Sequence, residues 1–182
     1  MKKLFFLLAF VLAGQLIMAQ QKPTDLDKSP MDVAYFPANY PLLKMRGQIN
    51  TDPSARIIYS RPQRKGREIF GGEVKYNEVW RLGANEATEI ELFKNATIGG
   101  KKVPKGRYTA YCIPAESKWT IVLNKDNYSW GSFSYKPEKD VARIDVPVQK
   151  VADNAEALTM YFDSNSWVIQ WENLKVAVPV AF

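Results

Sequence analysis

The feature that most constrains the fold is a period-two alternation of apolar and polar residues, which begins near Ala55 and continues to the end of the chain. Thr88, Ile90 and Leu92, for example, alternate with glutamates. Successive side chains of a strand point to opposite faces, so the alternation predicts strands with one buried face. Turn residues separate these strands at intervals of roughly 8–12 residues. We therefore predict an all-β, single-domain β-sandwich of jelly-roll or immunoglobulin-like character.

The clearest predicted hairpin lies near the C-terminus. Residues 158–162 and 167–171 both alternate, and the turn-forming residues 163–166 lie between them. Residues 174–180 predict a terminal strand. Three tryptophans occupy apolar positions of the predicted strands and are expected in the core: Trp119, Trp167 and Trp171.

Residues 1–19 have the pattern of a secretory signal peptide. Lys2 and Lys3 precede an uncharged apolar segment that ends at Met18, and Ala19 is a small residue suited to cleavage. The apolar segment is shorter than the ~20 residues that a membrane-spanning helix needs. We expect an exported protein, periplasmic or extracellular, with no stable membrane span after leader cleavage. The alternative is an uncleaved N-terminal anchor.

The rest of the chain divides into an arm and a domain. Residues 20–50 contain four prolines interleaved with aromatic residues. Because proline interrupts both helices and strand ladders, we predict a Pro-rich N-terminal arm that packs in part on the domain. Residues 51–182 form the predicted β domain.

The composition excludes several kinds of catalytic centre. The chain has no histidine and one cysteine, Cys112, which rules out Ser-His-Asp and Cys-His catalysis and zinc held by His or Cys clusters. We expect no metal and no cofactor, and we expect Cys112 to be buried. The formal charge of +6 is spread along the chain. Nucleic-acid binders usually cluster such charge on one face, so no nucleic-acid partner is expected.

The segment Val79-Trp80-Arg81-Leu82-Gly83-Ala84-Asn85-Glu86-Ala87-Thr88 places an arginine, an amide and a carboxylate at a predicted turn. A guanidinium binds carboxylate or phosphate with two parallel hydrogen bonds, so arginines at such a turn can form an anion site. The predicted ligand-binding residues are Arg61, Arg67, Trp80, Arg81, Asn85, Glu86 and Thr88. The structural alternative is that the arginines pair with Glu68, Glu86 or Glu89 and that the Asn85 side chain completes the turn.

Glu86 is also the candidate for acid–base catalysis. Sugar hydrolysis uses two carboxyl groups about 5–10 Å apart, and Glu89 or Glu91 could supply the second. Alternation places both on one strand face, however, which is typical of a solvated surface.

A third candidate segment, residues 128–135, interleaves aromatic residues with serine and glycine. Such a segment can form a platform for sugar rings or an adaptable protein-binding surface. The alternative is that its rings cover one end of the sandwich.

Four segments resemble a known family: residues 59–62, 66–71, 79–88 and 106–114, followed by Trp119. Their order and spacing are similar to those of the secreted bacterial domain-of-unknown-function 2911 family. The resemblance extends from about Ala55 to the C-terminus. It implies an exported, mainly β domain and supplies no established activity.

These observations predict an exported, non-catalytic binding module whose ligand is a polar or anionic small molecule, a glycan or a protein segment. Two alternatives are an extracellular carbohydrate-active acid–base enzyme that uses Glu86, and a purely structural envelope protein.

Overall fold

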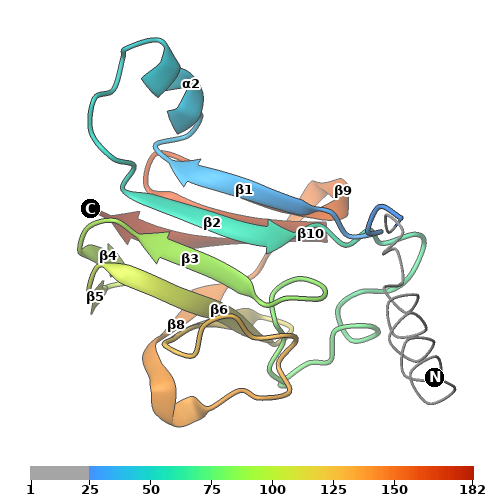
Figure 1. The fold of residues 1–182 in the computed structure, drawn as a ribbon. Coiled ribbons are helices and arrows are strands. Elements are labelled where there is room, and N and C mark those ends of the chain that lie inside the picture. The colour runs from blue at the N-terminus through green and yellow to red at the C-terminus, as the bar shows by residue number, and fades with distance from the viewer. Residues whose placement is uncertain (1–24) are drawn as a thin grey trace, which may run out of the picture.

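The computed structural model describes residues 25–182, so the predicted signal peptide lies outside the described residues. The described chain is mostly β-strand and forms two antiparallel sheets (Figure 1). Residues from both sheets contribute to one large apolar core. The predicted all-β sandwich is therefore confirmed.

The larger sheet has six strands in the order β1-β2-β3-β6-β7-β8. Their bounds are β1 Met31–Phe36, β2 Ala55–Ser60, β3 Thr88–Leu92, β6 Gly106–Pro114, β7 Lys118–Asn124 and β8 Asp140–Pro147. The smaller sheet has four strands in the order β5-β4-β10-β9. Their bounds are β5 Lys101–Val103, β4 Ala96–Ile98, β10 Ser166–Ala181 and β9 Gln149–Phe162. A short helix α2 (Tyr40–Met45) and a 3-10 turn η1 (Pro137–Lys139) complete the elements.

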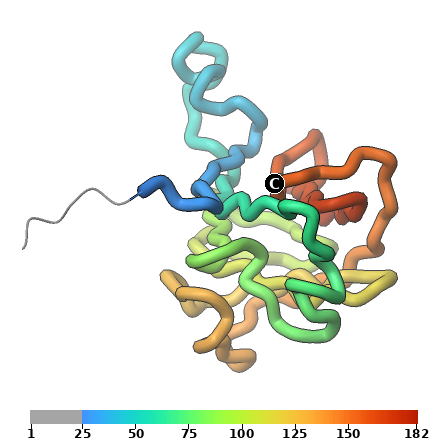
Figure 2. Tube along the Cα trace, turned by 90° about the vertical axis from the view of Figure 1, so that its right-hand side faces the viewer, coloured from blue at the N-terminus to red at the C-terminus, as the bar shows by residue number. Residues whose placement is uncertain are grey.

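The segment predicted as an arm contributes an edge strand to the larger sheet. β1 pairs antiparallel with β2 along its whole length. Phe36 packs against the rings of Phe162 and Phe182, with centroids 5.7 and 4.7 Å away. The predicted packing of the arm on the domain is thus observed for β1, whereas α2 projects from the body of the molecule (Figures 1 and 2).

β10 reverses its direction near its middle. A fully extended strand of its length would span about 50 Å. The amide of Val180 nevertheless donates to the carbonyl of Asn165 at 2.8 Å, so the two ends of β10 lie side by side. Glu172 has a positive φ of 52°, and the pairing with β9 shifts register on both sides of it. The second half of β10 is therefore the predicted terminal strand.

The apolar positions of the alternating segments lie in the core as expected. Trp119 and Trp167 have exposed fractions of 0% and Trp171 of 3%. Cys112 is also fully buried, and burial raises the pKa of its thiol well above the ordinary value. The three predicted core tryptophans are thus all buried. Within residues 25–182, no helix combines the length and apolar character needed to cross a bilayer.

Candidate functional site

The loop between β2 and β3 carries most of the predicted site residues, and its backbone conformation is unusual. Leu82 and Asn85 have positive φ values of 55° and 59°, a region that L-residues seldom adopt. The Ser60 hydroxyl holds the middle of the loop: it donates to the Ala84 carbonyl at 2.7 Å and accepts from the Ala84 amide at 2.6 Å. A Cβ on Gly83 would lie 2.8 Å from the same hydroxyl oxygen, so the close approach favours glycine there.

Two predicted site residues hold this loop together rather than face solvent. The Thr88 hydroxyl, which is buried, donates to the Leu82 carbonyl at 2.7 Å. The indole Nε1 of Trp80 donates to the Gly83 carbonyl at 3.1 Å. Because these side chains satisfy carbonyls that the loop would otherwise leave unpaired, they fix the position of Arg81 between them.

Two tryptophan side chains stack on each other next to this loop. The rings of Trp80 and Trp171 are stacked, with centroids 5.9 Å apart and an interplanar angle of 19°. Phe70 meets both rings edge-on. Trp80 is only 8% exposed, so this stack belongs to the end of the core.

Two hollows of about 200 Å³ each open beside Arg81. Both are lined by Glu73, Val74, Trp80 and Arg81. The first is completed by Arg67 and Trp171, among others. The second is completed by Lys75, Glu78 and Ser132, among others.

Arg81 is the unusual group of this region. Its Nε is buried and has no hydrogen-bond partner among residues 25–182. Its side chain makes no ion pair within the described part of the chain. Burial alone lowers the pKa of Arg81 from its ordinary value. A buried polar atom normally has a partner, so this guanidinium stands out.

Arg67 lies at the rim of the first hollow and is exposed. It forms an ion pair with Glu73 at 3.1 Å and donates to the carbonyls of Gln63 and Arg64. These bonds hold the Arg67 guanidinium at the rim.

Arg61 has a different place. It forms an ion pair with Asp32 of β1 at 3.1 Å and donates to the Leu158 carbonyl and the Thr159 hydroxyl of β9. Its guanidinium therefore ties together strands of the two sheets. Arg61 lines neither hollow beside Arg81.

Asn85 and Glu86 lie on the outer side of the loop. The Asn85 amide donates to Asp27 at 3.0 Å, and Glu86 is exposed. Arg81 and Glu86 form no ion pair. Arg61 and Arg67 pair with Asp32 and Glu73 instead of the glutamates that the structural alternative predicts.

The carboxylates considered as partners of Glu86 in catalysis are engaged elsewhere. Glu91 pairs with Arg56 at 2.7 Å. Arg107 lies 3.8 Å from Glu89 and 3.6 Å from Glu91. Among residues 25–182, no three acidic or cysteine side chains gather in a way that could hold a metal ion.

Residues that the sequence did not single out also line the hollows. Glu73 and Val74 precede the 79–88 segment, and Trp171 is expected from the sequence only as a core residue. No local pattern marks them, because they meet Arg81 only through the fold.

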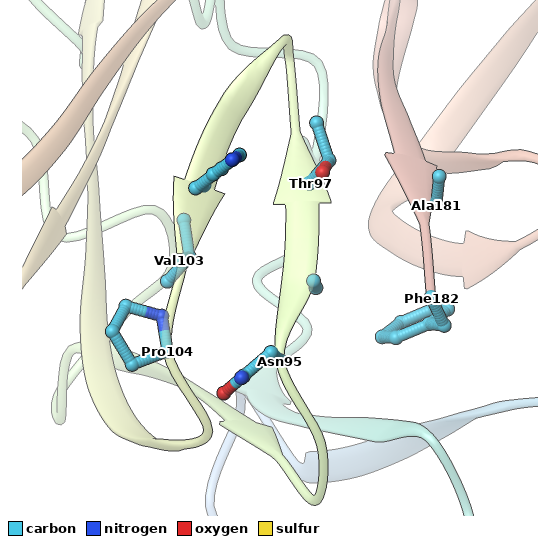
Figure 3. Close-up of a pocket in the computed structure, with 8 residues that line it drawn as sticks. Asn95, Thr97, Val103, Pro104, Ala181 and Phe182 are labelled. Carbon is cyan, nitrogen blue, oxygen red and sulfur yellow. The ribbon is translucent and has the colours of Figure 1, made fainter.

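A larger hollow lies elsewhere, across β4, β5 and the end of β10 (Figure 3). It has a volume of about 460 Å³. Asn95, Thr97 and Val103 line it on the side of β4 and β5, and Phe182 lines it opposite (Figure 3). Lys102 is its one charged side chain. Figure 1 places β4, β5 and the C-terminus on the opposite side of the molecule from the loop between β2 and β3. Size alone does not make it the better site, since it lacks convergent polar groups.

A family model described as "Protein of unknown function (DUF2911)" matches residues 41–180. No curated protein and no solved structure matches the chain.

Proposed function

Since this chain belongs to the DUF2911 family, whose description carries no activity, we propose a function from the geometry of the site. The protein is an exported, non-catalytic binding module that holds a small anionic group against Arg81. One observation carries the proposal: a half-buried guanidinium, whose Nε has no partner in the described part of the chain, borders two hollows.

The chemistry of the guanidinium selects the class of ligand. A partly buried cation without a counter-charge is costly, and a carboxylate or phosphate in a hollow beside Arg81 would supply that charge. The first hollow contains two arginines and one glutamate, so its formal charge also favours an anion. Of these three, Arg67 and Glu73 are paired with each other, which leaves the charge of Arg81 uncompensated.

The volume of the hollow limits the size of the bound group. The first hollow has a volume of about 200 Å³, so it has room for a small group rather than for a large ligand. That space suits a carboxylate or phosphate with a few further atoms. A larger ligand would have to extend out of the first hollow.

The direct test is a titration of the chain without its leader with sodium acetate and with inorganic phosphate, followed by NMR at the arginine Nε–Hε resonances. We expect the Arg81 resonance to shift with a saturable dependence on anion concentration, and Arg81→Gln to abolish saturable binding. Arg46→Gln is the matched control, because Arg46 is an exposed arginine at the end of α2. If a folded Arg81→Gln variant binds both anions as the parent does, the proposal is wrong.

A further inference from the structure

We infer that the anionic group at Arg81 is the carboxylate of an acidic sugar, whose ring lies against the aromatic segment 128–135. This inference rests on the anion-binding function proposed above and names the class of its ligand. It joins two features that are separate in the sequence. One is the loop before β3 that carries Arg81, Asn85 and Glu86, here called the charged loop, and the other is the aromatic segment between β7 and β8.

The aromatic segment exposes large rings to solvent. The exposed fractions are 79% for Tyr128, 59% for Trp130 and 87% for Phe133. Scattered exposed apolar residues are ordinary, but three large rings within six positions form a concentrated aromatic surface. The alternative that these rings cover the end of the sandwich therefore fails for these three residues.

Backbone hydrogen bonds join this segment to the charged loop. The Ala87 amide donates to the Ser129 carbonyl, and the Gly131 amide donates to the Asn85 carbonyl, both at 2.9 Å. Glu86 and Trp130 form a β-bridge between these bonds. The two segments thus form one continuous surface.

The second hollow brings Arg81 together with one residue of the aromatic segment. It is lined by Arg81 and by Ser132, which lies between Gly131 and Phe133 in the aromatic segment. Arg107 holds the Tyr128 side chain in place, because it donates to the Tyr128 hydroxyl at 3.2 Å and lies 5.6 Å from the ring centroid.

The charges of the two hollows differ in a way that fits an acidic sugar. The first has a positive formal charge, whereas the second has Arg81 and Lys75 balanced by Glu73 and Glu78. A carboxylate suits the first hollow. The uncharged, hydroxyl-bearing part of a sugar suits the second, where carboxylates and Ser132 can accept or donate hydrogen bonds.

The same charges disfavour a lipid surface as the occupant. Membrane-binding aromatic segments carry an excess of lysine and arginine beside the rings. Residues 125–140 contain equal numbers of basic and acidic side chains: Lys125, Lys136 and Lys139 against Asp126, Glu138 and Asp140. Asp126 pairs with both Lys136 and Lys139, so no basic cluster is left to attract anionic headgroups.

The test compares matched ligands by isothermal titration of the chain without its leader. D-galacturonate and D-glucuronate are the acidic sugars, D-galactose and D-glucose are their neutral counterparts, and acetate is the anion without a ring. We expect at least one uronate to bind about tenfold more tightly than acetate and more tightly than its neutral counterpart, since an aromatic contact contributes up to about a factor of ten.

Two variants separate the contributions. Trp130→Ala should reduce uronate affinity to the level of acetate and leave acetate binding unchanged, whereas Arg81→Gln should remove both. Tyr161→Ala, at a 39% exposed aromatic on β9, is the matched control and should change neither.

The outcomes distinguish the acidic-sugar inference from the anion-binding function on which it rests. If acetate binds at Arg81 but neither uronate binds more tightly, the inference is overturned and anion binding stands. If neutral sugars bind as tightly as the uronates, or if Trp130→Ala changes nothing, the inference is also overturned. If no anion binds, both proposals fail.

Discussion

Arg61 and Arg81 belong to the same predicted cluster, yet their surroundings are opposite. Arg61 reaches Asp32, a backbone carbonyl and a hydroxyl, and these partners come from strands of both sheets. Arg81 has a buried Nε with no hydrogen-bond partner in the chain from residue 25 onward. An arginine-rich motif thus marks a place where charge must be accommodated. Whether each arginine supports the scaffold or faces a ligand depends on which carboxylates the fold brings to it.

The two regions also differ in what surrounds the guanidinium. Arg61 lies where β1 of the larger sheet and β9 of the smaller sheet approach each other, and hydrogen-bonding groups of both strands face it. Arg81 lines the first hollow together with Trp80 and Trp171, beside a loop in which Trp80 and Thr88 already donate to the carbonyls of Gly83 and Leu82. Few acceptors are therefore left for Arg81 to use.

The largest expected effect in this comparison concerns Arg61. Arg61→Gln should lower the free energy of unfolding by about 1–3 kcal/mol, because it removes hydrogen bonds to Asp32, Leu158 and Thr159 across the two sheets. Urea unfolding followed by circular dichroism measures the change. Phosphate affinity should stay the same, and a loss of binding in the folded variant would move Arg61 from the scaffold to the site.

A smaller effect on stability is expected at Tyr135, whose hydroxyl, like the Arg61 guanidinium, has hydrogen-bond partners within the fold. Its hydroxyl donates to Asp140 at 2.6 Å and accepts from Arg143 at 2.7 Å. Tyr135→Phe should lower the free energy of unfolding by about 1 kcal/mol at neutral pH.

The pH dependence of Tyr135 provides a second measurement. Burial, followed by the hydrogen bond to Asp140, raises the pKa of Tyr135 from 10.0 to about 12. The folded state then holds a proton that the unfolded state releases, so stability falls as pH rises from about 10 to about 12. Tyr135→Phe should show a shallower fall over this range in urea unfolding at a series of pH values. An identical slope in both proteins would show that Tyr135 does not cause it.

The smallest effect on stability is expected at Arg81. Arg81→Gln breaks no ion pair or side-chain hydrogen bond among residues 25–182, and it removes a partly desolvated charge. The free energy of unfolding without added anion should therefore change by less than about 1 kcal/mol, or increase slightly. Added phosphate should raise the thermal midpoint of the parent and leave that of the variant unchanged. A large destabilisation by Arg81→Gln would show that Arg81, like Arg61, stabilises the fold instead of serving a ligand.

The core was more predictable than the site. Alternation identified the buried faces of Trp119, Trp167 and Trp171, because a side chain's direction in a strand depends only on its position along that strand. β1 was not predicted as a strand, since Pro30 and Pro37 bound six residues within a proline-rich segment. Its strand conformation is stabilised by pairing with β2, which lies more than 15 residues further along the chain.

Local periodicity and residue type were enough to predict the β-sandwich, the buried tryptophans and cysteine, and the segment in which charge and turn chemistry coincide. Three properties depend on the folded chain: the pairing of Arg61, the absence of a partner for Arg81 among residues 25–182, and the contact between the aromatic segment and the charged loop. Such contacts join residues 29 to 98 positions apart, as between Arg61 and its partners Asp32 and Thr159, and no local pattern specifies them.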